Sequence, residues 1–251
     1  MILDEIIKRT QKRVALLPSE LPENGFGSRA SLIDAIQNSN GRNAVIAEIK
    51  CASPSRGIIR RNVDMAMMAG ALAGSGCVAL SVLTEPYYFG GTVQDIPRVK
   101  SAVSIPVLRK DFIIDEQQIA ESRALGADAV LLIAAVLKER LPLFVDLAQE
   151  YDLEPLVEVH NLKEVKTALA TSAELIGINN RNLSTLTIDR SITRLLSKGI
   201  RSAGRLIVSE SGMQSADDIR EMKPYCDAFL IGSSIMEHEL PQKKLEEFVC
   251  A

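Results

Sequence analysis

Several features that mark large classes of proteins are missing from this sequence. The 29 Lys and Arg residues are outnumbered by 32 Asp and Glu, which gives a formal net charge of −3. The chain therefore has no basic excess with which to neutralise a nucleic-acid backbone. No uninterrupted apolar run reaches the 18 or so residues that a membrane-spanning helix needs. We expect a protein that binds neither nucleic acid nor membrane.

Cysteine is scarce and scattered. Cys51, Cys77, Cys226 and Cys250 form no CxxC pair and have no histidine at the spacing of metal ligands. We interpret all four as reduced thiols, and we expect a cytoplasmic protein without a metal site.

What the sequence does contain is a repeated alternation of apolar and amphipathic segments. From Ala44 onward, a short apolar run, a polar loop and an amphipathic segment follow one another again and again. Eight strand–helix units in 251 residues favour a single (β/α)8 TIM barrel. A doubly wound open sheet is the alternative, but no GxGxxG follows the first run. The predicted strands are Val45–Lys50, Val78–Leu83, Pro106–Arg109, Ala129–Ile133, Pro155–Val159, Leu175–Ile178, Leu206–Ser209 and Ala228–Ile231.

The segment before the first strand predicts helices. Leu3, Ile6, Ile7 and Val14 have helical spacing between Met1 and Val14, and the segment lacks the continuous apolar region of a signal peptide. A second short helix is expected around Ser31–Gln37, after a polar stretch with Pro and Gly over residues 18–28. We expect one domain over residues 1–251, in which residues 1–43 form a helical extension packed on the barrel.

Two later helix starts are marked by pairs of capping residues. Asp115 precedes Gln118, and Ser215 precedes Asp218, each at the three-residue spacing of a capping box. Gly126 marks the end of the first of these helices. The loops after the predicted strands therefore lead directly into helices.

Polar side chains recur at one parity near the ends of the predicted strands. Because strand side chains alternate between faces, each of these groups shares a face with an apolar or glycine residue two or four positions earlier. The strand end is where barrel enzymes build their active sites. Two lysines and three glutamates at one mouth are costly to desolvate unless they are paired, so they form either a functional cluster or an ion-pair network. Repetition on five strands favours function; the pairs are Glu48 and Lys50 after Ile46, Lys110 after Leu108, Glu158 after Leu156, Asn179 after Gly177, and Glu210 after Val208.

Three loops have the composition of an anion site. Gly212 follows the seventh predicted strand and Gly232-Ser233-Ser234 follows the eighth. Glycine lets backbone N–H groups approach an anion, and these two loops are the usual phosphate site of such barrels. The first loop, Cys51–Gly57, is long, basic and rich in hydroxyl groups. It is either a mobile lid over an anionic substrate or a plain turn.

Six segments stand out in order along almost the whole chain: Ile46–Gly57, Leu108–Phe112, Leu156–His160, Ile176–Leu183, Ser209–Gly212 and Phe229–Ser234. Together they resemble the indole-3-glycerol-phosphate synthase family. Cys51 stands where many members have a basic residue and Arg56 where lysine is expected, but neither position is assigned to the chemistry. The resemblance implies conversion of 1-(o-carboxyphenylamino)-1-deoxyribulose 5-phosphate to indole-3-glycerol phosphate in tryptophan biosynthesis, with loss of CO₂ and water. It implies no metal and no organic cofactor.

The resemblance also implies catalytic roles. Lys110 matches the general acid that protonates the ribulose carbonyl during ring closure. Glu158, Glu48 and Lys50 match the groups that act in the dehydration, which needs an acid for the departing hydroxyl and a base for the nitrogen-bound proton; which group acts in which step stays open. The remaining matches are Asn179 and Glu210, which would hold hydroxyls and orient the lysines, and Ser211, which would contact the substrate.

The same resemblance implies two binding subsites. The phosphate would lie on Ser53, Arg181, Gly212, Gly232 and Ser233. The carboxyphenyl ring would lie against Pro54, Phe89, Phe112, Leu131 and Ile133, although ordinary barrel packing explains these apolar residues equally well.

Three other functions are compatible with this scaffold. Phosphoribosylanthranilate isomerase is the nearest, but we expect a Cys and an Asp at its early strand ends, where this chain has Glu48 and Lys50. A Schiff-base aldolase would use Lys110 or Lys50 as nucleophile. A non-catalytic phosphate-metabolite binder would need few of the carboxylates. We expect a small phosphorylated substrate, a monomer or weak oligomer, and other enzymes of the tryptophan pathway as candidate partners.

Overall fold

The computed structural model describes residues 2–18, 29–39 and 41–251. Met1, at the predicted start of the first helix, and residues 19–28 of the predicted polar stretch lie outside the described residues. Within the described residues, no helix is long and apolar enough to cross a membrane.

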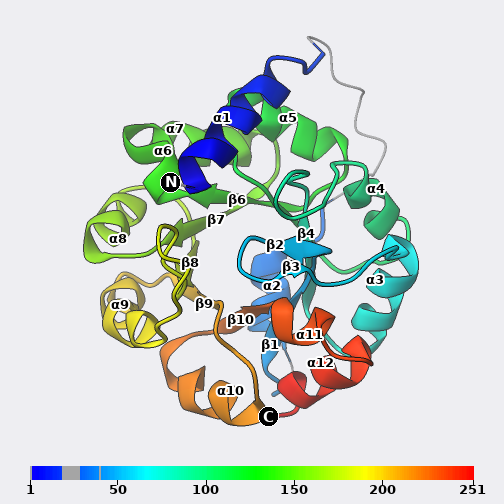
Figure 1. Cartoon of the computed structure of the whole chain (residues 1–251). Helices are drawn as coiled ribbons and strands as arrows, with labels where there is room; N and C mark the ends of the chain where they lie inside the picture. Colours follow the sequence, from blue (N-terminus) through cyan, green and yellow to red (C-terminus); the bar gives the residue numbers. More distant parts are fainter. Residues whose placement is uncertain (1, 19–28, 40) are drawn as a thin grey trace.

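Eight parallel strands close into a barrel (Figure 1). Each strand pairs with the next along the chain, and β1 also pairs with β10, so the sheet has no free edge. The predicted (β/α)8 barrel is confirmed, and every predicted strand boundary lies within one residue of the observed one. The strands are β1 (Ala44–Ile49), β4 (Ala79–Leu83), β5 (Val107–Lys110), β6 (Ala129–Ile133), β7 (Glu154–Val159), β8 (Leu175–Asn179), β9 (Leu206–Glu210) and β10 (Ala228–Ile231).

Helices form the outer ring that Figure 1 shows around the strands. Alternation along each strand explains the two layers of the core: Val45 and Ile49 pack toward the helices, whereas Ile46 packs inside the barrel. The longer helices are α3 (Met65–Gly74), α4 (Asp95–Lys100), α5 (Glu116–Ala124), α7 (Leu141–Glu150), α8 (Leu162–Leu169), α9 (Ser191–Ser202), α10 (Ala216–Met222) and α12 (Pro241–Val249). Single turns are α6 (Ala134–Leu137), η1 (Lys138–Arg140), η2 (Lys223–Tyr225) and α11 (Ser233–Met236).

Both predicted capping boxes are present. The Asp115 carboxylate accepts from the backbone of α5, and the Gln118 side chain accepts from Asp115 N at 3.2 Å. Ser215 and Asp218 form the same reciprocal pair at the start of α10. Gly126 has φ +90°, the left-handed backbone that ends a helix with little strain only at glycine.

Two helices lie at opposite ends of the barrel. In α2 (Leu32–Gln37), Leu32 and Ile36 are buried in the interior apolar cluster, and Leu32 N and Ile33 N donate at 2.7 and 3.0 Å to Glu154 at the start of β7. The first helix, α1 (Ile2–Val14), buries Ile6 in the same cluster. Figure 1 shows α2 behind the centre of the barrel and α1 across its upper rim.

The loop after β1 forms a small hairpin. Its strands, β2 (Ala52–Ser53) and β3 (Gly57–Ile58), pair antiparallel, and Gly57 has φ +67° at the turn. Ala52 N donates to Phe89 O at 3.1 Å, which joins the hairpin to the loop after β4. A plain turn and a lid were the two expected alternatives, and the paired strands were not predicted.

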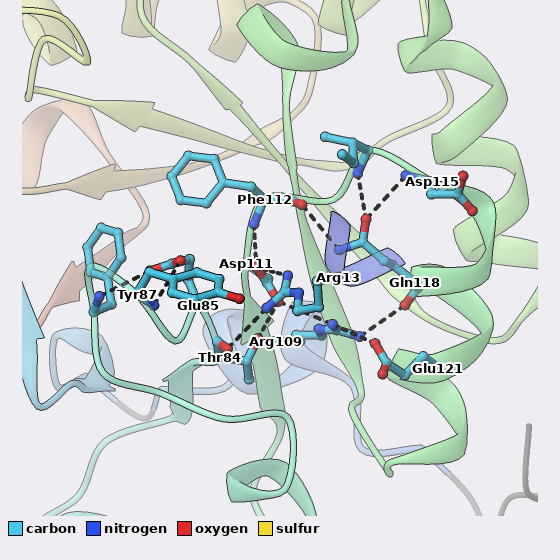
Figure 2. A network of polar contacts seen from close by, with 12 residues as sticks. Arg13, Thr84, Glu85, Tyr87, Arg109, Asp111, Phe112, Asp115, Gln118 and Glu121 are labelled. Carbon is cyan, nitrogen blue, oxygen red and sulfur yellow. Dashed lines mark hydrogen bonds and ion pairs between the residues drawn. The ribbon is translucent and has the colours of Figure 1, made fainter. Parts of the chain in front are cut away.

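A buried network of charges surrounds the end of β5 (Figure 2). Arg109 has no exposed surface on the helix-facing side of β5, and its Nη2 lies 2.7 Å from Glu121 Oε2 and 3.2 Å from Asp111 Oδ2. Asp111 also accepts from Arg13 Nη2 of α1, at 2.8 Å for both carboxylate oxygens, and from Thr84 Oγ1 at 2.7 Å. Asp111 therefore ties α1 to the ends of β4 and β5.

Candidate active site

A cavity of about 350 Å³ opens at the carboxyl ends of the strands. Every site residue predicted from the sequence lines this cavity, except Glu210. Glu210 has no exposed surface and lies behind Lys110. The cavity wall also contains residues that the sequence analysis missed, among them Ile2, Leu3 and Ile6 of α1, Leu183, Leu186 and Ile188 of the loop after β8, and Met213.

Lys110 stands at the centre of the predicted cluster. Its Nζ lies 2.8 Å from Glu210 Oε2 and 3.7 Å from a carboxylate oxygen of each of Glu48 and Glu158. Burial disfavours the ammonium, but the charges of Glu210, Glu48 and Glu158 outweigh it and raise the pKa of Lys110. The lysine is therefore protonated at neutral pH and can supply a proton to a substrate in the cavity.

The carboxylates beside Lys110 have different proton affinities. Burial raises the pKa of Glu210 to about 7, with Lys110 opposing the change and Glu158 reinforcing it. Burial would also raise the pKa of Glu48, but the charges of Lys50 and Lys110 together lower it. Lys50 Nζ lies 2.7 Å from Glu48 Oε1. Neighbouring groups held in different proton states are what sequential acid and base steps require.

Glu158 is a further carboxylate beside Lys110. Burial would raise its pKa, but contacts with His160 and Lys110, and a hydrogen bond from Asn179, lower it to about 2. The Asn179 amide is oriented because its Oδ1 accepts from Arg181 N at 3.0 Å. Glu158 therefore faces the cavity as an anion over the whole neutral range.

Two glycines, Gly177 in β8 and Gly232 directly after β10, make room for the buried glutamates. A Cβ at Gly177 would lie 2.2 Å from Glu210 Oε1, and a Cβ at Gly232 would lie 2.3 Å from Glu48 Oε1. Real contacts are never so short, so a side chain at either position would displace a carboxylate. The inward face of β8 thus lacks a side chain where Glu210 needs space to hold Lys110.

This geometry predicts a catalytic defect in Gly177→Ala. The added methyl group pushes the Glu210 carboxylate away from Lys110 Nζ, now 2.8 Å from Glu210 Oε2. A displacement of about 1 Å costs on the order of 10²-fold in rate, so kcat should fall by about that factor. Gly199→Ala in α9 is the matched control, because a Cβ there meets nothing within 4 Å. Equal kcat values for the two variants would contradict the role of Gly177.

The far side of the cavity has the features of an anion site. Ser53 Oγ is buried and has no hydrogen-bond partner within the described part of the chain. The backbone at Ser211 and Gly212 has φ +65° and +96°, and Gly232 precedes the turn α11. Arg181 Nη1 donates to Leu186 O at 2.9 Å, and among residues 2–18, 29–39 and 41–251 no carboxylate lies within ion-pair distance of it. Burial lowers the pKa of Arg181, so an anion beside it would be favourable.

The same cavity also has apolar lining residues. Phe89 and Phe112 lie with ring centroids 6.3 Å apart, near Leu131 and Ile133, which also line the cavity. The loop that presents Phe89 is held by Glu85, whose carboxylate accepts from the backbone N of Tyr87, Tyr88 and Phe89 at 2.7 to 3.1 Å. Part of this arrangement is visible in Figure 2. The cavity therefore suits a ligand that carries both a planar apolar group and an anion.

Comparison with known proteins agrees with this geometry. Residues 3–248 match the family model described as indole-3-glycerol phosphate synthase. A curated indole-3-glycerol phosphate synthase from Caldanaerobacter subterraneus is 42% identical, over 99% of this chain and 98% of its own length. One of the same description from Carboxydothermus hydrogenoformans is 39% identical, over 98% of each chain.

Solved structures at lower identity share the fold. A tryptophan synthase structure from M. tuberculosis superposes with a TM-score of 0.65 at 13% identity, over 88% of this chain and 99% of that one. A structure from Aquifex aeolicus gives a TM-score of 0.64 at 13% identity, over 87% and 98%. At this identity the likeness extends to the barrel alone.

Proposed function

The chain belongs to the indole-3-glycerol phosphate synthase family, and on that premise we propose how its cavity carries out the family reaction. It acts as a decarboxylating lyase of tryptophan biosynthesis on the carboxyphenylamino-deoxyribulose phosphate. The observation that carries the proposal is Lys110, held among three carboxylates at the edge of a cavity with an apolar wall and an anion site.

Lys110 acts in the first step. The anilino ring carbon that bears the carboxylate attacks the ribulose carbonyl carbon, and Lys110 donates a proton to the carbonyl oxygen. The C–CO₂ bond then breaks, and its electron pair restores the aromatic ring. Glu210 does not reach the cavity, so it serves as a positioning residue that fixes the Lys110 ammonium at 2.8 Å.

The second step removes water. The oxygen protonated during ring closure leaves as water after it receives a second proton. Lys50 is placed for that donation, because Glu48 holds its Nζ at 2.7 Å at the cavity surface. Glu158, an anion with Asn179 beside it, accepts the proton that is released as the indole forms. Ser211 lines the cavity next to these groups and contacts the substrate.

The binding subsites account for the rest of the substrate. The phosphate lies on Ser53, Arg181 and the backbone of Gly212, Gly232 and Ser233, where glycine and the helical turn present N–H groups. The carboxyphenyl ring packs between Pro54, Phe89 and Phe112, above Leu131 and Ile133. All reacting atoms then fall between the two subsites.

Removal of the Arg181 side chain should weaken binding without slowing the chemistry. A hydrogen bond to a charged group contributes about 1.5–3 kcal/mol, so Arg181→Ala should raise KM by roughly 10- to 100-fold and leave kcat within about threefold. Inorganic phosphate should compete less well against this variant than against the wild type. Arg194→Ala is the control, because Arg194 pairs with Glu221 on the helical surface. A loss confined to kcat would contradict a phosphate-binding role.

The direct test of the function is to mix the purified chain with the substrate in metal-free buffer and record indole fluorescence. The sequence has no tryptophan, so the background is low. Growth of an indole signal supports the lyase function without a cofactor. Absence of an indole signal from folded protein with intact substrate contradicts it. Borohydride treatment during turnover should leave the protein mass unchanged, whereas a trapped adduct would indicate a Schiff-base enzyme.

We also propose a cytoplasmic protein of one domain, monomeric or weakly oligomeric, with residues 1–43 as an extension of the barrel. All four cysteines are free, and burial raises the pKa of Cys77 and Cys226 to about 12, which suits unreactive reduced thiols. The helix α1 supplies Ile2, Leu3 and Ile6 to the cavity wall, which supports its treatment as part of the same domain. Light scattering on the full chain tests the oligomeric state.

A further inference from the structure

His160 lies between two carboxylates at the end of β7. Its Nε2 is 3.2 Å from Glu158 Oε1, and its Nδ1 is 3.1 Å from Glu164 Oε2. The imidazole is mostly buried, with 13% of the side chain exposed. Neither His160 nor Glu164 lines the cavity. One imidazole ring thus connects the cavity carboxylate Glu158 to a carboxylate on the surrounding layer of helices.

Glu164 is a fixed anchor. It stands in the first turn of α8, where its Oε2 also accepts from His160 N at 2.8 Å and its Oε1 accepts from Asn161 Nδ2 at 2.5 Å. The Asn161 side chain caps the same helix by accepting from Glu164 N at 3.0 Å. A negative charge is favourable at a helix N-terminus. The helix start therefore fixes the position of Glu164. Burial opposes its ionisation, but the contacts with His160 lower the pKa of Glu164.

An imidazole with a carboxylate at each nitrogen is stable as the imidazolium. Burial opposes that charge, but Glu158 and Glu164 outweigh it and raise the pKa of His160 to about 10. The other ionisable groups around Glu158 are Lys110 of β5, at 3.7 Å, Glu48 of β1 and Glu210 of β9. Lys110 is shared among all three glutamates, whereas His160 contacts only Glu158 of the three.

The contact between His160 and Glu158 acts through charge. Its 3.2 Å separation is an ion-pair distance, but the atoms lack hydrogen-bond alignment, and Glu158 Oε1 has no hydrogen-bond partner within the described part of the chain. This oxygen is itself buried, so the nearby cation favours the ionised form of the carboxylate without occupying its other oxygen, Oε2, which lies 3.7 Å from Lys110 Nζ.

We infer that His160 is a positioning residue for the reaction: anchored by Glu164, its imidazolium holds the Glu158 carboxylate in place and ionised. The inference rests on the proposed role of Glu158 as the base. His160 itself touches no substrate. It acts on the reaction only by way of Glu158.

The test compares His160→Gln with the wild type in the pH dependence of kcat/KM. Loss of the cation raises the pKa of Glu158, so the acid limb of the profile should move upward by at least about one pH unit, which is tenfold in activity on that limb. Activity should recover as the pH rises. Glu164→Gln should shift the limb in the same direction, and His238→Gln, at an exposed turn, should not shift it. A purely structural His160 would instead lower activity equally at every pH, and that result overturns the inference.

The charge of the ring is measured separately by NMR. The chain has two histidines, so in His238→Gln the only imidazole resonances belong to His160. Both ring nitrogens should carry protons throughout the neutral range, and the ring should titrate at lower pH when Glu164→Gln is added. A neutral ring at pH 7 overturns the inference.

The failure of the inference and the failure of the proposed function are distinguishable. If the wild type forms no indole, the proposed function fails. If the wild type forms indole but the pH profile of His160→Gln is not shifted, only the role of His160 is overturned.

Discussion

Lys110→Ala should lower kcat for indole formation by about 10⁴-fold, the upper end of what a general acid contributes. The large value is expected because the variant loses the proton donor and also the cation that Glu48, Glu158 and Glu210 share. Single-turnover indole fluorescence measures the rate. Competition with inorganic phosphate should show that the anion site, which Lys110 does not contact, still binds.

Two further variants make this prediction specific. Lys110→Met keeps most of the side-chain length without the charge, so it should be as slow as Lys110→Ala if the proton is what matters. Lys163→Ala, at an exposed position on α8, should stay within about threefold of the wild type because surface substitutions rarely matter. Turnover by Lys110→Met at the wild-type rate would show that another group is the acid.

Asp111→Asn should produce the largest loss of stability among single conservative changes near the site. Asp111 is fully buried and neutralises both Arg13 and Arg109, and Arg109 has no exposed surface either. Breaking a buried ion pair by removing one partner costs about 3–5 kcal/mol; because Glu121 still pairs with Arg109 at 2.7 Å, we expect about 3 kcal/mol in the free energy of unfolding. Urea denaturation at neutral pH measures it. Asp115→Ala, which removes only a helix cap, should cost about 1 kcal/mol.

The contribution of Asp111 has a defined pH dependence. Burial opposes its ionisation, but Arg109, Arg13 and Thr84 together lower its pKa below the ordinary value. Its stabilising effect is therefore complete above the unfolded-state pKa of about 3.9 and is lost as the pH falls through the lower folded-state value. The difference in stability between the wild type and Asp111→Asn should be constant from neutral pH down to about 5 and shrink only in stronger acid. A difference that grows on acidification would contradict this assignment.

The sequence was most informative where a local pattern decides the structure. Short apolar runs located all eight strands, and the parity of Glu48, Lys110 and Glu158 placed them at one cavity because side-chain alternation is a property of the backbone. The capping pairs at Asp115 and Ser215 depend on contacts three residues apart, and both formed as predicted. The resemblance to a known family added residue roles that no local pattern contains.

The features that were missed depend on residues distant in sequence. Arg109 has the parity of a helix-facing residue, where a charge is unexpected, and only its pairing with Glu121 and Asp111 in the folded chain makes it tolerable. His160 was noted as part of a motif, but its anchor Glu164 becomes its partner only when α8 begins at Asn161. The hairpin strands β2 and β3 have two residues each, too short for any periodicity.

The structural role of two glycines was only partly predicted from the sequence. Gly232 was predicted as a phosphate contact from its position after the last strand, and Gly177 was noted only for sharing a face with Asn179. Their second property, the space they leave for Glu48 and Glu210, depends on neighbouring strands in register: Glu210 pairs with Asn179 across β8 and β9. Such a property is a feature of packing and cannot be read from one strand alone.

Closure of the barrel between its first and last strands has a consequence for synthesis on the ribosome. Val45 and Ile46 of β1 lie in register with Phe229 and Leu230 of β10, so one edge of β1 has no partner until the final strand has left the exit tunnel. An unpaired edge is a template for association with other chains. The nascent protein thus carries an exposed strand for most of its translation, and its catalytic cluster, in which Glu48 of β1 meets Glu210 of β9 around one lysine, assembles only near the end.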